Sequence, residues 1–174
     1  MSVLPKFYIK VFLFFGIGFA LLMIIMDCIL RDPIDLYKSL VQVFFFGGFM
    51  TMVSVPGQIN TLRKLGVTDF TPDNLNVSQK RKLLFSLSKE ELIDRIRENS
   101  HLSKMKMRSN NDEIYLTSRF SWNLLGEIVK IRIRTQEDGM NEFDIVSRPR
   151  QWFTLLDGGQ NYNHVTVLEK VIMP

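Results

Sequence analysis

Two long apolar stretches separated by a short polar connection dominate the first third of this 174-residue chain. Residues 11–30 contain one charged residue, Asp27, near their end, and residues 39–55 contain none. About twenty apolar residues in an α-helix rise about 30 Å, which matches the hydrocarbon core of a bilayer. The pattern predicts a transmembrane hairpin over residues 1–56, with helices at about 11–30 and 37–55.

The first apolar stretch differs from a cleavable signal peptide, because it is longer than the usual apolar region and no small-residue cleavage site follows it. Basic residues near helix ends favour the cytoplasmic side. Lys6 and Lys10 precede the first helix, and Arg63 and Lys64 follow the second. We therefore expect an integral inner-membrane or plasma-membrane protein that crosses twice, with both termini cytoplasmic.

Small residues recur four positions apart in each predicted helix. Such pairs allow helix backbones to approach closely in lipid, either within the hairpin or against another membrane subunit. Asp27 and Lys38 flank the connection, and we predict a salt bridge between them across it. The candidate helix-packing residues are Gly16, Ala20, Gly47 and Thr51.

The rest of the chain has the composition of a globular domain. Pro56-Gly57 is expected to end the second helix, residues 57–79 to form a linker, and residues 80–174 to form a cytosolic domain. Residues 58–174 carry 18 basic and 15 acidic side chains, a balance that argues against nucleic-acid binding. The single cysteine, Cys28, excludes an intrachain disulfide.

Alternating and helical patterns predict the elements of this domain. Residues 82–87 are expected to form a strand that places Leu83, Phe85 and Leu87 on one face. Ser88 and Glu91 form a capping box that begins a helix ending near Asn99. Two β-hairpins follow, and a last short strand is expected at 152–156.

The first hairpin joins residues 105–109 to 112–116. A two-residue Asn110-Asn111 turn suits positive φ angles and pairs Met107 with Ile114 on the apolar face. This register also pairs Arg108 with Glu113 on the other face.

The second hairpin joins residues 129–134 to 142–145. A two-residue turn would place Ile133 opposite Asp144, whereas a three-residue Glu137-Asp138-Gly139 loop places it opposite Phe143. We predict the second register, with Gly139 in the left-handed region. It pairs Ile131 with Ile145, Arg132 with Asp144 and Arg134 with Glu142.

A C-terminal helix follows a glycine turn and is expected to be capped by Asn161 or Asn163. The complete fold class is a two-helix transmembrane hairpin plus an α+β domain. Its antiparallel sheet has about five strands, its helices pack on one face, and its order is β-α-β-β-β-β-(β)-α. The apolar residues expected to bury this helix are Val165, Leu168, Val171 and Ile172.

The sequence offers one candidate anion site. The turn at 157–159 precedes a helix, whose N-terminal N–H groups attract anions. Arg148 and Arg150 are close in sequence and could join Gly158 and Gly159. The plainer interpretation is a capped turn beside two solvated arginines. A second basic stripe, Lys130, Arg132 and Arg134, is expected to be largely neutralised by its cross-strand carboxylates.

No sequence motif indicates catalysis, a cofactor or a metal. His101 and His164 have no metal-ligand spacing, and Cys28 lies in an apolar helix. Trp122 and Trp152 are expected to pack in the core or at its edge.

Two functions remain open. The first is a non-enzymatic membrane accessory or assembly subunit, which engages a membrane or cytosolic partner or a second copy of itself. It predicts an exposed apolar patch near Trp152 and Phe153 and no pocket. The second is a membrane effector whose domain senses a small anion such as a nucleotide. It predicts that Arg148 and Arg150 converge with the turn at 157–160 on one pocket.

Overall fold

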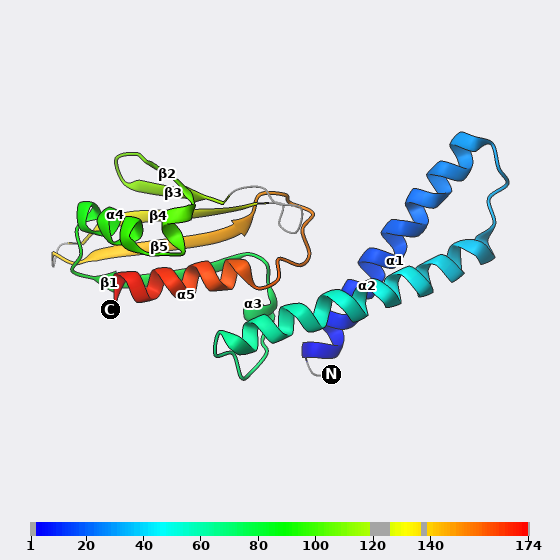
Figure 1. The fold of residues 1–174 in the computed structure, drawn as a ribbon, viewed down its shortest axis with the longest axis horizontal. Helices are drawn as coiled ribbons and strands as arrows, with labels where there is room; N and C mark the ends of the chain where they lie inside the picture. The colour runs from blue at the N-terminus through cyan, green and yellow to red at the C-terminus, as the bar shows by residue number, and fades with distance from the viewer. Residues whose placement is uncertain (1–2, 119–125, 137–138, 174) are drawn as a thin grey trace. The chain divides into compact units, whose positions relative to one another are not determined.

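The computed structural model describes residues 3–118, 126–136 and 139–173. The chain forms two compact units, residues 1–75 and 76–174, which Figure 1 shows as a helical hairpin and a sheet with helices. Trp122 and part of the predicted Glu137-Asp138-Gly139 loop lie outside the described residues.

The first unit contains two long helices, α1 (Val3–Leu30) and α2 (Leu36–Lys64), followed by the single turn α3 (Pro72–Leu75). Asp35 caps α2 by accepting hydrogen bonds from the backbone N–H groups of residues 37 and 38. Lys38 Nζ lies 3.1 Å from Asp27 Oδ1, so the predicted ion pair across the connection is confirmed.

The prediction that α2 ends at Pro56 is wrong, because the helix continues to Lys64. A proline inside a helix removes one backbone hydrogen bond and usually kinks the helix. Beyond it, however, Ile59 and Leu62 are buried, and Gln58 Nε2 lies 3.5 Å from the Leu75 carbonyl oxygen. Apolar burial in this last part of α2 offsets the lost hydrogen bond.

The two helices approach most closely where glycines face each other. A Cβ added to Gly47 would lie 2.7 Å from the Phe12 carbonyl oxygen and 3.1 Å from the Gly16 Cα. Ala20 and Thr51, the partners of these glycines four positions along, are also buried. The small residues therefore pack within the hairpin, which is one of the two uses that the sequence allowed.

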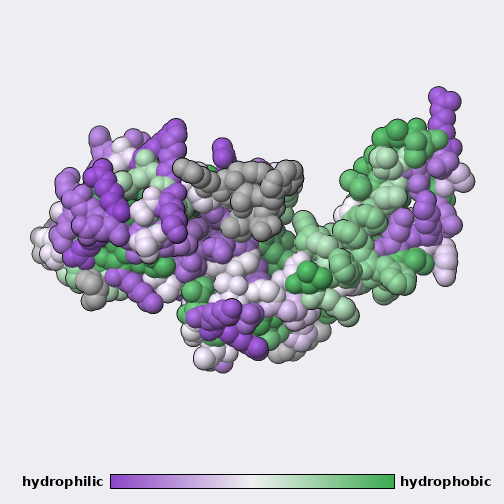
Figure 2. Space-filling view, viewed as in Figure 1, coloured by the Kyte–Doolittle hydropathy of each residue, from purple (hydrophilic) through white to green (hydrophobic). Residues whose placement is uncertain are grey.

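Apolar side chains make up much of the hairpin surface that is visible in Figure 2, where green lies over α1 and α2. Large apolar side chains remain exposed on both helices; examples are Leu22, Ile25, Phe45 and Met52. Both helices are long and apolar enough to cross a membrane.

The second unit is a five-stranded antiparallel sheet with the strand order β1-β5-β4-β3-β2. Its strands are β1 (Gln79–Phe85), β2 (Lys106–Ser109), β3 (Glu113–Thr117), β4 (Glu127–Thr135) and β5 (Asn141–Pro149). The helices are α4 (Lys89–Glu98), the 3₁₀ turn η1 (Leu102–Lys104) and α5 (Gln160–Ile172).

Helices α4 and α5 lie on the same face of the sheet, which we call the helical face (Figure 1). Ser88 caps α4 by accepting a hydrogen bond from the Glu91 N–H at 3.1 Å, as its position in the capping box predicts. Leu92 and Ile96 of α4 and Leu168 of α5 are buried in the core against the central strands. The predicted arrangement of a sheet with helices on one side is confirmed.

The register of the β4–β5 hairpin is the predicted one. Ile133 pairs with Phe143 and Arg132 with Asp144, and Gly139 has a φ of 78°. In the β2–β3 hairpin the prediction is wrong by two residues, because Met107 pairs with Leu116. A slip of two keeps every side chain on its face, so the apolar pattern cannot distinguish the two registers.

Four other expectations fail near strand and helix ends. Residues 152–156 form no strand, because β5 ends at Pro149 and the Trp152 side chain is exposed, so no burial favours pairing. The expectation that Trp152 packs in the core or at its edge is wrong for the same reason. Residues 72–75 of the predicted linker form α3. Helix α5 is preceded by Gly159 in the left-handed region, and the Asp157 carboxylate caps it in place of the two expected asparagines.

We expect Gly47→Val to separate α1 from α2, because the new side chain meets the Phe12 backbone. Such overpacking costs about 1–3 kcal/mol. The Phe19 and Phe46 rings stack at 4.1 Å, so cysteines at these positions report helix approach. In a Cys28→Ser background, Gly47→Val should slow their oxidative cross-linking about tenfold.

The control is Gly48→Val, which adds the same side chain where nothing lies within 4 Å. Equal cross-linking rates in the two valine variants would contradict the packing described here.

Candidate functional site

The predicted anion site at the start of α5 already holds a carboxylate of the chain itself. Asp157 accepts hydrogen bonds from the Gly159 N–H at 3.0 Å and from the Asn161 N–H at 2.8 Å. It also accepts one from Asn161 Nδ2 at 2.7 Å. Burial raises the pKa of Asp157, and these hydrogen bonds oppose the rise. The N–H groups of Gly159 and Asn161 are therefore engaged by the chain itself.

A buried chain of hydrogen bonds extends from this cap to the sheet. Ser147 of β5 donates to Asn161 Oδ1 at 2.6 Å, and Ser147 Oγ lies 3.4 Å from His164 Nδ1. The residue types resemble a Ser-His-Asp set, but the Ser147 side chain is fully buried and its proton points to an amide. A nucleophile must reach its substrate. We therefore interpret the chain as the polar contact that joins α5 to β5.

A cavity of about 520 Å³ lies beside this chain of hydrogen bonds. The rings of His101 and His164 are 5.2 Å apart at its wall. Burial lowers the pKa of His164 to about 4, and burial together with Lys104 lowers the pKa of His101. Burial also raises the pKa of Glu127, whose carboxylate accepts a hydrogen bond from the Ser118 hydroxyl. The lowered pKa values of His101 and His164 favour the uncharged imidazoles.

In residues 3–118, 126–136 and 139–173, no group of three or more His, Cys, Asp or Glu side chains could hold a metal ion.

The second candidate surface is the face of the sheet opposite α4 and α5, which we call the open face. Side chains alternate between the two faces of a strand, and paired residues share a face. Lys130 of β4 pairs with Tyr115 and Val146, so these three lie together on the open face. The same register places eight basic residues there: Lys80, Lys82, Lys106, Arg108, Lys130, Arg132, Arg134 and Arg148.

Two of the three carboxylates on the open face each contact two of these basic side chains. Glu113 lies 2.8 Å from Lys130 and 2.9 Å from Arg132. Hydrogen bonds from Lys130, Tyr115 and Arg132 lower the pKa of Glu113 to about 2. Glu142 lies 3.7 Å from Lys82 Nζ and 3.8 Å from Arg134 Nη1.

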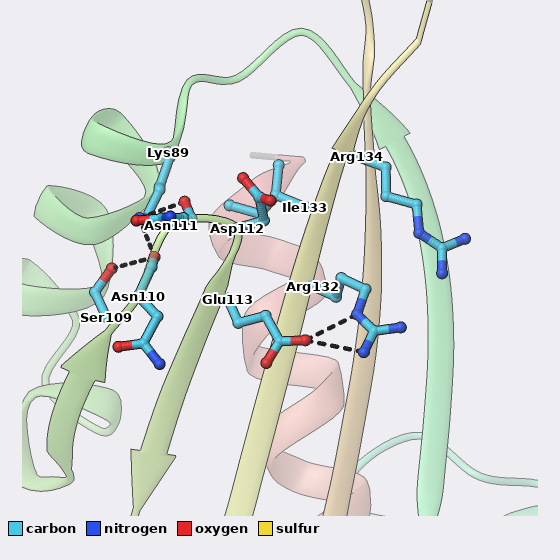
Figure 3. A pocket seen from close by; sticks show the side chains of 9 residues that line it. All are labelled: Lys89, Ser109, Asn110, Asn111, Asp112, Glu113, Arg132, Ile133 and Arg134. Atoms are coloured by element: carbon cyan, nitrogen blue, oxygen red, sulfur yellow. Dashed lines mark hydrogen bonds and ion pairs between the residues drawn. The ribbon is translucent and has the colours of Figure 1, made fainter.

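A shallow pocket of about 840 Å³ borders the open face at the β2–β3 turn. Figure 3 shows Arg132 joined to Glu113, with the Arg134 guanidinium directed away from them. Lys89 of α4 donates hydrogen bonds to the carbonyl oxygens of Asn110 and Asn111, the latter at 2.8 Å. The Lys89 ammonium therefore stabilises the turn.

The four residues of the predicted anion site do not line one pocket. Arg148 is exposed and pairs with Ile128 on the open face, whereas its neighbour Ser147 contacts α5 on the helical face. Arg150 is exposed beyond the end of β5. Gly158 and Gly159 belong to the turn that Asp157 closes. Anion binding by these residues stays a prediction, and the structure separates Arg148 from the turn.

Sequence reasoning missed the open face as a unit. The sequence pattern paired β4 with β5 alone, and in that pair the basic stripe of Lys130, Arg132 and Arg134 is opposed by carboxylates. The strand order adds the basic residues of β1 and β2, which are remote in sequence from β4. The alternation of Lys80 with Lys82, and of Lys106 with Arg108, was the available signal.

Comparisons with protein families, with curated protein sequences and with solved structures find no match to this chain.

The buried His164 predicts a loss of stability in acid. Its pKa is about 4 in the folded state and about 6.5 when unfolded, so the unfolded chain binds an extra proton between these values. Stability from this residue is present above about pH 6.5 and is lost as the pH falls towards 4. The raised pKa values of Glu127 and Asp157 act in the opposite direction.

Comparing the original chain with the His164→Gln variant isolates the contribution of His164 to the pH dependence of stability. From about pH 7.5 to pH 5, the opening free energy of α5 should fall by about 2 kcal/mol more in the original chain than in the variant. Hydrogen exchange of the α5 amides in the detergent-solubilised full chain measures it. Parallel pH profiles in the two proteins would show that His164 is not buried as an uncharged group.

Proposed function

We propose that this protein is a non-enzymatic, two-pass membrane protein that acts as an accessory or assembly subunit. The observation that carries the proposal is the outer surface of the hairpin, where large apolar side chains are exposed along both helices. In water such a surface would favour aggregation, whereas in a bilayer it contacts lipid.

Charge near the helix ends supports an orientation with both termini cytoplasmic, in an inner or plasma membrane. Arg63 and Lys64 lie in the last turn of α2, and Lys6 and Lys10 lie in the first turns of α1. The α+β domain would then lie on the cytoplasmic side. The Asp27–Lys38 pair would lie near the opposite interface, where its charges need not enter the hydrocarbon core.

Exposed aromatic side chains support an assembly role for the domain. The Trp152 side chain is 93% exposed and Phe153 is 49% exposed, with ring centroids 5.8 Å apart. Exposed tryptophan is costly for a soluble surface and is enriched at the centres of protein interfaces. This pair, which we call the aromatic patch, is the proposed contact with a partner protein.

The buried polar groups are hydrogen-bonded to one another, which supports a binding role over catalysis. Asp157, Asn161 and Ser147 satisfy one another, and the Ser147 hydroxyl is inaccessible. These groups stabilise the contact between α5 and the sheet.

A second candidate is the sensing of a small anion such as a nucleotide. The pocket at the β2–β3 turn favours it, because Arg132 and Arg134 both line a space of about 840 Å³. Glu113 and Asp112 line the same pocket and oppose anion binding, so assembly is the better supported function.

The assembly role is tested by native mass spectrometry of the protein gently extracted from its own membrane. We expect a partner protein at fixed stoichiometry. The double variant Trp152→Ala and Phe153→Ala should lower the bound fraction at least tenfold, as interface hot spots do. Leu84→Ala, which truncates an exposed apolar side chain elsewhere, should leave the complex intact. A monomer without partner in every preparation would contradict the proposal.

A further inference from the structure

The open face carries a large excess of positive charge for one side of a small sheet. Against its eight basic side chains, the described strands place three carboxylates there: Glu113, Glu142 and Asp144. Because Glu113 and Glu142 are each shared between two basic groups, they neutralise only part of that charge.

Four basic side chains of the open face form no ion pair with any residue that the structure describes, and all four are exposed. They come from three strands and flank the paired groups on both sides. These four, which we call the free cations, are Lys80, Lys106, Arg108 and Arg148.

The chemistry of this face fits lipid headgroups better than nucleic acid. Proteins that bind single strands on a sheet stack bases on exposed aromatic rings. Tyr115 is the aromatic residue among the described open-face positions, and its ring lies 5.3 Å from Lys130 Nζ while its hydroxyl binds Glu113. The ring is therefore engaged. Ile128 and Val146 alternate with the basic residues and suit the boundary between headgroups and acyl chains.

With the hairpin inserted as proposed, the linker keeps the whole domain within reach of the bilayer. Fourteen residues separate Lys64, the end of α2, from Gln79, the start of β1. Even fully extended they span about 50 Å, so the domain samples a small volume at high effective concentration. The first free cation, Lys80, is the second residue of β1.

We propose that the open face binds the headgroups of anionic phospholipids in the membrane that holds the hairpin. The inference rests on the proposed membrane insertion and adds a second contact, between the domain and the surface of the same bilayer. Phosphate and carboxylate groups of the headgroups would pair with the free cations, and the binding would weaken with salt. The aromatic patch lies outside the sheet strands and is not used.

The test uses the full chain in lipid nanodiscs, with Cys28→Ser and Thr117→Cys to give a single cysteine on the open face. Thr117 pairs with Lys106 and Ile128. A fluorophore on this cysteine is quenched by acrylamide, a neutral solute. In nanodiscs containing phosphatidylglycerol, quenching should fall at least threefold relative to pure phosphatidylcholine, and high salt should restore it.

A matched pair of variants tests whether the protection from quenching depends on the open face. The test variant neutralises three free cations, and the control variant removes the same charge elsewhere in the domain, from α4, η1 and α5. The test substitutions are Lys80→Gln, Lys106→Gln and Arg148→Gln, and the control substitutions are Arg97→Gln, Lys104→Gln and Lys170→Gln.

Protection that the test variant loses and the control keeps supports the proposal. Equal loss in both variants would overturn the assignment to this face, and equal protection in neutral lipid would overturn the electrostatic basis. A third outcome would also overturn the proposal: anionic lipid gives no protection, and the protein instead binds an RNA oligonucleotide. If only the test variant loses that binding, the ligand of the open face is nucleic acid and not lipid.

Failure of the proposed insertion gives a separate result. A chain that does not co-elute with nanodiscs has no membrane anchor, which contradicts the proposed function. A chain that co-elutes but shows no protection in anionic lipid contradicts only the lipid contact of the open face.

Discussion

The close approach of α1 and α2 is the contact on which the rest of the first unit depends. Gly16 and Gly47 remove the side chains that would separate the backbones, and the helices then present their bulky residues outward. In a bilayer, where no hydrophobic force drives helices together, close van der Waals packing between small residues supplies the association. The Asp27–Lys38 pair closes the connected end. In the proposed function, two helices packed in this way form the membrane anchor of the following domain.

The domain depends on a different feature: one face of its sheet is apolar and the other is charged. Apolar side chains from α4 and α5 fill the helical face, where the Asp157 cap joins the start of α5 to the sheet through Asn161 and Ser147. The open face carries eight of the domain's sixteen Lys and Arg residues. The same alternation along each strand thus supplies both the core and the surface proposed to bind lipid.

The sequence predicted a register where the alternative would have placed a charged side chain against the core, and it predicted the Ser88 cap, but it predicted neither the β2–β3 register nor the Asp157 cap of α5. The β4–β5 register followed from the sequence because a wrong turn length would have placed Ile133 opposite Asp144. The β2–β3 register did not, because a slip of two residues preserves both faces. The candidate site failed for a related reason. Arg148 was assigned to the α5 turn by nearness in sequence, yet alternation along β5 sends it to the opposite face from Ser147.

The most direct test of the account is the side of the membrane on which each segment lies. Single cysteines in a Cys28→Ser background, at Ile34 in the connection and at Lys104 in the domain, can be labelled with a membrane-impermeant maleimide in intact cells and after lysis. The account predicts that Ile34→Cys is labelled in intact cells and Lys104→Cys only after lysis. Labelling of both positions in intact cells, or of neither before lysis, would contradict a hairpin that crosses the membrane twice with its domain inside.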